Sequence, residues 1–208
     1  MRQSGACLKR WRGSIPACCI ALLMSPPTAD CQRNFNLQSA AANSPCKVEF
    51  VYYDIHGQDG TELREAMNQN GPFDHSGVRR DAFTAWYIHW NWPSTDGKPD
   101  FRKARSFCDV TITLPRWEPG DGVNSGLVNK WEEFIQRLEQ HEARHLGFAS
   151  QIYPKIPEAV KKAARKNRDL DSQQANDIAQ EFLTRLRRMD REYDSETGNG
   201  RLEGVRFP

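Results

Sequence analysis

The sequence lacks three features that would each point to a broad class of protein. Beyond its first 29 residues it has no apolar run long enough to cross a bilayer as a helix, it has no internal repeat, and it has no excess of one charge. The formal net charge of +2 depends on four basic residues near the start, and without them 25 basic and 27 acidic residues remain. Bulk charge therefore gives no case for binding nucleic acid or an anionic membrane surface.

The leading segment has the pattern of a signal peptide. A basic stretch at residues 9–12 precedes a short apolar run at residues 15–24, and no acidic residue comes before Asp30. We therefore predict a signal peptide over residues 1–29, with a disordered N-terminus as the alternative. Residues 30–46 are rich in Asn, Ser, Gln and Ala, which is typical of a tether, and residues 47–208 are the predicted folded domain.

Three cysteines follow the predicted signal peptide, and an odd number in an exported chain needs an explanation. In one interpretation Cys31 carries a lipid that attaches the protein to a membrane, and Cys46 pairs with Cys108. Asp30 is not the small residue that normally precedes a lipidated cysteine. The other interpretation is one disulfide and one free thiol, and the sequence leaves the pairing open.

Alternating apolar and polar residues predict three strands. Residues 47–55, 82–92 and 101–114 each show the period of two that is typical of a half-buried strand. We expect Pro115 to end the third strand, because proline cannot donate a hydrogen bond to a ladder. Residues 61–70 have helical spacing instead. The second strand has an apolar row on one face, made of Trp86, Ile88, Trp90 and Trp92.

The period then changes to about 3.6 residues, which predicts two long helices. One apolar stripe runs through residues 127–152 and a second through residues 171–193, with Pro154 and Pro157 interrupting the chain after the first. The layout predicts an α+β fold in which a small antiparallel sheet is followed by two long helices.

The segment His141-Glu142-Ala143-Arg144-His145 has the H-E-x-x-H spacing of zinc metallopeptidases. Two histidines four residues apart lie on one face of a helix, so both imidazoles can bind one zinc ion. The glutamate between them can take a proton from a water that attacks a carbonyl. Both histidines fall on the apolar stripe, and burying three polar groups without a partner would cost several kcal/mol. We therefore predict that His141 and His145 bind Zn²⁺ and that Glu142 is the general base.

Local spacing does not give the third zinc ligand. Acidic residues on or before the last helix are one group of candidates, and histidines from strands or turns are another. These candidates are Asp169, Asp171, Asp177, Glu181, Glu192, His56, His75 and His89.

Basic residues are frequent in the last helical region, where Arg185, Arg187, Arg188 and Arg191 follow one another closely. Acidic residues are interleaved with them, and this pattern favours a solvated helix face over a dedicated binding surface.

The chain resembles a bacterial domain family of unknown function whose members are labelled secreted zinc-dependent proteases. The resemblance runs through most of the chain after the tether, and the order and spacing of its segments are more specific than the zinc motif alone. The matching segments are Tyr52-Tyr53-Asp54-Ile55-x-Gly57, Gly71-Pro72, Thr84-x-Trp86-x-Ile88-x-Trp90, Thr113-Leu114-Pro115-x-Trp117, Trp131-x-x-Phe134 ahead of His141-Glu142-x-x-His145, and Tyr193-Asp194-x-x-Thr197-x-Asn199-Gly200.

The resemblance implies an exported, zincin-like fold and a peptidase activity. It also exposes two departures. The family pattern has a His where this chain has Asn199, and Asn is a weak zinc ligand, so Asp194, Glu196 or another group would have to replace it. The pattern also has a Cys near residues 168–170 that would pair with Cys108, and its absence here turns attention to Cys46.

Two functions remain for the domain. The first is an exported zinc-dependent peptide hydrolase, periplasmic or secreted, that acts on a peptide or protein, with Glu142 as base and Tyr193 as a candidate transition-state stabiliser. The second is a catalytically weakened zincin scaffold in the bacterial envelope that binds a partner or peptidoglycan, and the Asn199 departure favours it. Fold analogy alone does not decide between them.

Overall fold

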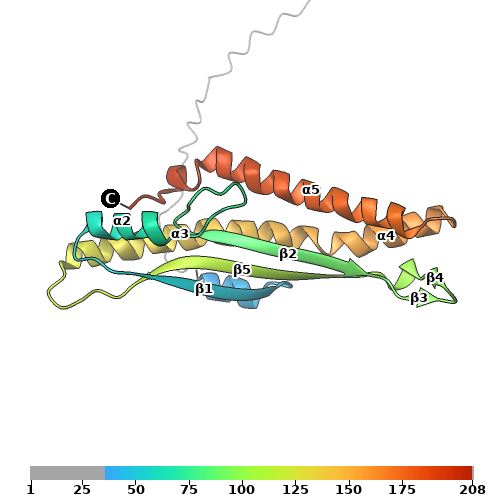
Figure 1. The fold of residues 1–208 in the computed structure, drawn as a ribbon, viewed down its shortest axis with the longest axis horizontal. Coiled ribbons are helices and arrows are strands. Elements are labelled where there is room, and N and C mark those ends of the chain that lie inside the picture. The colour runs from blue at the N-terminus through green and yellow to red at the C-terminus, as the bar shows by residue number, and fades with distance from the viewer. Residues whose placement is uncertain (1–35, 208) are drawn as a thin grey trace, which may run out of the picture. The chain divides into compact units, whose positions relative to one another are not determined.

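The computed structural model describes residues 36–207, so the predicted signal peptide, the first part of the predicted tether and Cys31 lie outside the described residues. Figure 1 shows a three-stranded sheet with long helices running beside it. The predicted α+β class, with a small sheet and long helices, is confirmed. In chain order the elements are α1 (Leu37–Ala42), β1 (Lys47–Ile55), α2 (Gly60–Asn70), β2 (Phe83–Asn91), β3 (Ser94–Thr95), β4 (Lys98–Pro99), the 3₁₀ turn η2 (Phe101–Lys103), β5 (Arg105–Trp117), α3 (Ser125–Ile152), α4 (Lys155–Lys166), α5 (Ser172–Thr197) and the 3₁₀ turn η3 (Arg201–Glu203).

The sheet is mixed, which corrects the prediction of an antiparallel sheet. Its strand order is β1-β5-β2, with β1 parallel and β2 antiparallel to the central β5. Phe50 lies opposite Ile112 in the parallel pair, and Ile88 lies opposite Cys108 in the antiparallel pair. A parallel pair needs a long connection, and here α2 and β2 supply it. Alternation along a strand reveals which residues share a face, but it does not reveal the direction of the neighbouring strand.

The central strand continues through Pro115 to Trp117, so the prediction that Pro115 ends it was wrong. The register explains this. β2 pairs with β5 only as far as Thr113, whereas β1 follows β5 to its end, with Tyr53 opposite Pro115. Pro115 therefore lies where β5 has one hydrogen-bonded neighbour, and proline is tolerated in a strand with an open edge.

The main core lies between the sheet and α3. Val110, Ile112 and Leu114 alternate along β5 and are almost completely buried, while α3 contributes Trp131 and Phe134 from its apolar stripe. The predicted stripe of the first long helix is thus confirmed. Because His141 and His145 continue the same stripe, the packing that forms the core also turns both histidines inward.

The chain reverses after α4, so that α5 returns along α4 and α3 (Figure 1). Asp171 caps α5 by a reciprocal capping box with Gln174, which fixes where the returning helix begins. Two tryptophans of β2, and Trp92 just after its end, donate hydrogen bonds to this helix through their indole N–H groups. Trp86 donates to Asp190, Trp90 to Asn176 and Trp92 to Ser172, at 2.9, 2.9 and 3.3 Å.

None of the helices in the described part of the chain is long and apolar enough to cross a membrane.

The second half of the predicted tether is structured. Asn36 caps α1, Leu37 is 1% exposed in the core, and Cys46 forms a disulfide with Cys108 of β5. The polar composition of residues 36–46 did not indicate this short helix. Its contacts with the core are made by a single buried leucine and a nearby disulfide, which leave little apolar pattern in the sequence. The pairing of Cys46 with Cys108 is one that the sequence had left open.

Candidate metal centre

The two histidines of the H-E-x-x-H segment converge on one carboxylate of the returning helix. His141 and His145 are 5% and 7% exposed, and Asp194 of α5 faces both of them. Its Oδ1 atom lies 3.2 Å from Nε2 of His141 and 3.0 Å from Nε2 of His145. The donor atoms of all three residues lie within 4.8 Å of one another, and within residues 36–207 no other group of three such side chains does so.

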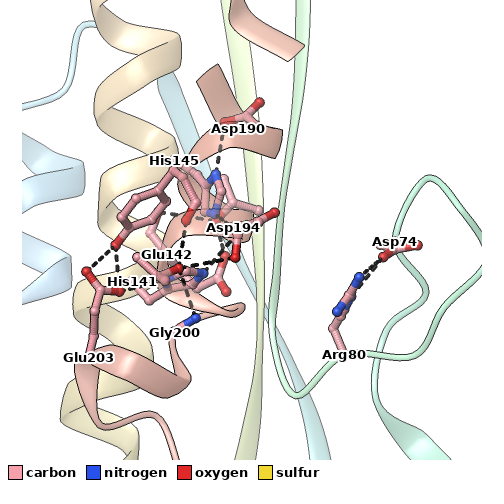
Figure 2. A network of polar contacts seen from close by, with 12 residues as sticks. Asp74, Arg80, His141, Glu142, His145, Asp190, Asp194, Gly200 and Glu203 are labelled. Carbon is pink, nitrogen blue, oxygen red and sulfur yellow. Dashed lines mark hydrogen bonds and ion pairs between the residues drawn. The ribbon is translucent and has the colours of Figure 1, made fainter. Parts of the chain in front are cut away.

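A second carboxylate holds the far nitrogen of each imidazole (Figure 2). Nδ1 of His145 lies 2.9 Å from Asp190, and Nδ1 of His141 lies 3.0 Å from Glu203 of η3. When each ring is neutral, this arrangement places its proton on Nδ1 and leaves the lone pair of Nε2 directed at the shared site. Histidine ligands of metal ions have this kind of carboxylate support, which fixes the ring and makes it a stronger ligand.

These contacts shift the pKa of each group. Burial disfavours the charged imidazolium, but the hydrogen bonds to Asp190 and Asp194 outweigh burial and raise the pKa of His145 to about 10. The pKa of His141 is also raised, because its bonds to Asp194 and Glu203 outweigh burial in the same way. For Asp194, hydrogen bonds from both histidines overcome burial and lower the pKa well below its usual range.

The donor set fits zinc. Two imidazole nitrogens and a carboxylate oxygen are the ligand types of catalytic zinc sites, which have three protein ligands and one open position. Atoms that share a tetrahedral zinc at about 2.0–2.1 Å lie roughly 3.3 Å apart. The two distances from Asp194 to the imidazoles, 3.2 and 3.0 Å, are close to that separation. Magnesium and calcium would favour a shell made of oxygen atoms, which two histidines do not supply.

Glu142 lies beside the three donors and is 4% exposed. Its Oε2 accepts a hydrogen bond from the hydroxyl of Thr84 on β2, at 2.7 Å. Burial raises the pKa of Glu142, opposed by the two neighbouring histidines and by the Thr84 hydrogen bond. A carboxylate with a raised pKa and a fixed orientation is suited to receive a proton, because general bases work best when their pKa lies near the working pH.

Tyr193 contacts the centre from the side of Glu203. Its ring stacks on His141 with the ring centroids 4.8 Å apart, and its hydroxyl donates to Glu203 at 2.8 Å. Glu203 therefore binds both the hydroxyl of Tyr193 and Nδ1 of His141. The role of Tyr193 in stabilising a transition state stays a prediction, and in this arrangement its hydroxyl is bound to Glu203.

A tight turn after α5 brings Glu203 to the histidines. Gly198, Asn199 and Gly200 all have positive φ angles, of 59°, 55° and 80°. A side chain at Gly200 would meet its surroundings at once, since a Cβ atom there would lie 2.7 Å from Val205 and 3.3 Å from His141. Glycine at this position thus allows the chain to pass directly beneath His141 on its way to η3.

The family described as "Bacterial protein of unknown function (DUF922)" matches residues 50–200. The chain belongs to the DUF922 family. The matched region contains Thr84, the H-E-x-x-H segment, Asp190 and Asp194, and it ends before Glu203. No curated protein and no solved structure gives a significant match, so likeness to the zincin fold stays a prediction.

The centre of this DUF922 protein opens into a cleft of about 860 Å³. The loop between α2 and β2 forms one wall, and α5 with the turn that follows it forms the other. Asn199, the first of the two departures from the predicted family pattern, is exposed and also lines the cleft. Asp194 supplies the third donor atom that the sequence analysis had left open between Asp194, Glu196 and other groups.

The other candidates for the third ligand lie elsewhere. Asp171 caps α5, Asp177 accepts a hydrogen bond from Gln173, and His89 stacks on Phe107. His75 packs against Phe83 at the rim of the cleft. The remaining candidates are exposed residues outside the lining of the cleft, namely His56, Asp169, Glu181, Glu192 and Glu196.

The sequence prediction missed three residues that position the centre, namely Thr84, Asp190 and Glu203. Asp190 had a usable signal, because it precedes Asp194 by one helical turn and therefore shares its face. Thr84 and Glu203 are brought to the centre only by the packing of β2 and of the turn after α5. Their positions along the chain do not reveal this.

Proposed function

We propose that this protein is an exported, zinc-dependent peptide hydrolase. The observation that carries the proposal is the joint arrangement of His141, His145 and Asp194, with a buried Glu142 beside them at the edge of a cleft. Three protein ligands and an open position are typical of a catalytic zinc site, whereas structural sites are usually closed by four. The family match is consistent with a bacterial protein but names no activity.

The proposed mechanism assigns a task to each group of residues. His141, His145 and Asp194 would hold zinc, which when bound lowers the pKa of a coordinated water and polarises a carbonyl. Glu142 would accept the proton of the attacking water and pass it to the leaving amine. Thr84 keeps one carboxylate oxygen of Glu142 in place, so the other is free for proton transfer.

Export rests on two observations. The pattern of residues 1–29 predicts a signal peptide, and these residues lie outside the described part of the chain. The disulfide between Cys46 and Cys108 supports an oxidising compartment, because such bonds rarely persist in the cytosol. Mass spectrometry of the protein secreted or released from the periplasm should show an N-terminus near residue 30, and an uncleaved chain kept in the cytosol would contradict export.

The first experiment is a measurement of metal content. The purified protein should hold about one zinc per chain, and His141→Ala should lose it. Glu142→Gln should keep the zinc and lose the cleavage of a peptide library, because the substitution keeps the shape of the side chain and removes the base. If neither the wild type nor Glu142→Gln binds zinc even when it is supplied, the hydrolase proposal fails.

A result with bound zinc and no cleavage of any peptide would instead favour the second function, a scaffold that binds a partner in the bacterial envelope. The observation on its side is the departure at Asn199, a residue that lines the cleft.

A further inference from the structure

Arginines line both walls of the cleft beside the metal centre. Arg187 and Arg191 lie one turn apart on α5, Arg201 follows on η3, and Arg79 and Arg80 come from the loop before β2. Of the four closely spaced arginines in the last helix, Arg187 and Arg191 line the cleft, whereas Arg185 and Arg188 do not.

The acidic groups of the cleft already have partners. Asp74 binds Arg80 at 2.7 Å across the cleft from the histidines (Figure 2), and Asp81 binds Arg64 at 2.7 Å. The remaining carboxylates of the cleft belong to the metal centre and bind its histidines or Thr84. None of them forms an ion pair with the other arginines of the cleft.

Arg187, Arg191 and Arg201 have no carboxylate partner among the residues that the structure describes. Arg187 lies over the ring of Trp86, with 5.6 Å from its guanidinium to the ring centroid. By contrast, Arg188, on the same helix but outside the cleft, pairs with Glu192 at 3.6 Å. The cleft therefore has three arginines in its lining that form no ion pair with a carboxylate of the described residues.

Along the chain, Asp194 of the metal centre comes after Arg187 and Arg191 on α5 and before Arg201 on η3. His145 binds Asp190, the neighbour of Arg191, whereas His141 binds Glu203 of the same turn that carries Arg201. We infer that a peptide with its carbonyl at the centre would meet the guanidinium groups of α5 towards one end and that of η3 towards the other.

We propose that the cleft recognises acidic peptides, with Asp or Glu side chains bound by Arg187 and Arg191 on one side of the scissile bond and by Arg201 on the other. Guanidinium groups bind carboxylates through two parallel hydrogen bonds, and arginines without an ion-pair partner are free to bind a carboxylate of the substrate. This inference names the substrate class of the proposed hydrolase and rests on that function.

Binding and cleavage are measured separately. For binding, the Glu142→Gln protein is titrated into two fluorescein-labelled peptides, one alternating Glu and Ala and the other alternating Gln and Ala, and anisotropy gives each Kd. At low ionic strength the Glu peptide should bind about tenfold more tightly, because each exposed ion pair contributes up to about fivefold. The advantage should shrink in physiological salt, where charges are screened beyond about 8 Å.

A matched pair of double variants tests the role of the cleft. Arg187→Gln with Arg191→Gln should weaken the binding of the Glu peptide about fivefold, because Arg201 remains, and leave the affinity for the Gln peptide unchanged. Arg185→Gln with Arg188→Gln removes the same charge from the same helix outside the cleft, and it should change neither. The unfolding midpoint and zinc content of both variants show that each remains folded.

Equal binding of the two peptides, or equal losses in the two double variants, would overturn the acidic preference. The cleavage of the same peptides by the wild type separates this failure from that of the hydrolase itself. Cleavage of both peptides at equal kcat/KM would keep the hydrolase and refute the substrate class. Arginine-dependent binding of the Glu peptide without any cleavage would support the acidic-peptide site and refute the hydrolase.

Discussion

Replacing Asp190 by Asn should weaken zinc binding without removing a ligand. One oxygen of Asp190 holds Nδ1 of His145 at 2.9 Å, and the other accepts the indole N–H of Trp86 at 2.9 Å. The amide keeps the shape of the side chain and one acceptor, but it loses the charge that strengthens His145 as a ligand. Loss of such a supporting group typically costs about 10- to 100-fold in metal affinity, or about 1.4–2.7 kcal/mol.

Competition between protons and zinc for His145 decides how large the loss of zinc affinity is within this range. The carboxylate of Asp190 also favours the protonated imidazolium, and together with Asp194 it raises the pKa of His145 to about 10. The variant therefore loses affinity for zinc and for the competing proton at once. We expect a loss of about tenfold at neutral pH, growing towards about 100-fold as the pH rises and proton competition fades.

Competition with a chromophoric chelator measures the loss of zinc affinity at neutral pH and its growth as the pH rises. Asn176→Ala is the control, because it removes the corresponding hydrogen bond from Trp90 at 2.9 Å without touching a histidine. It should cost about 1 kcal/mol of stability and leave zinc affinity unchanged. The reasoning fails if Asp190→Asn binds zinc as tightly as the wild type, or if both variants weaken zinc binding alike.

Three further outcomes are expected. Gly200→Ala should lower the free energy of unfolding in urea by about 1–3 kcal/mol, because Cβ would lie 2.7 Å from a neighbouring side chain at a φ of 80°. Gly204→Ala, with a φ of 88° and no heavy atom closer than 3.7 Å, should cost less, and equal losses would contradict the steric reasoning. The metal-free protein should lose stability as the pH rises from about 6.5 to 10. Folding raises the pKa of His145 from about 6.5 to about 10, so the protonated imidazole stabilises the fold fully below pH 6.5 and this stabilisation is lost as the pH approaches 10. An unfolding midpoint that does not change with pH in the presence of a chelator would refute this. Reducing the disulfide between Cys46 and Cys108, 62 residues apart, should cost about 4 kcal/mol in the same assay, and an unchanged midpoint would contradict it.

Much of the fold could be predicted from periodicity. Residues 47–55 form β1 as predicted, and the two apolar stripes correspond to α3 and α5. Periodicity works here because each element has one buried face. It could not reveal the parallel pairing of β1 with β5 or the continuation through Pro115, because both depend on which strand lies alongside.

The candidate site was also predictable only in part from the sequence. His141, Glu142 and His145 lie within one helical turn, so their spacing alone brings them together. Asp194 was one of several acidic residues predicted as a possible third ligand, and the return of α5 along α3 brings it to Nε2 of both imidazoles. Glu203 depends on three successive residues with positive φ angles, a backbone path that side-chain patterns do not encode.

The hydrogen bond from Trp86 to Asp190 has a consequence for how the centre can be observed. Because Asp190 also holds His145, the indole of Trp86 is one hydrogen-bonded residue away from a predicted zinc ligand. Indole fluorescence responds to the partner of its N–H group, so a metal ion that withdraws charge from His145 should shift the emission of this ring. The difference between the spectra of the wild type and Trp86→Phe would isolate that signal, and the protein would then carry its own optical indicator of metal occupancy.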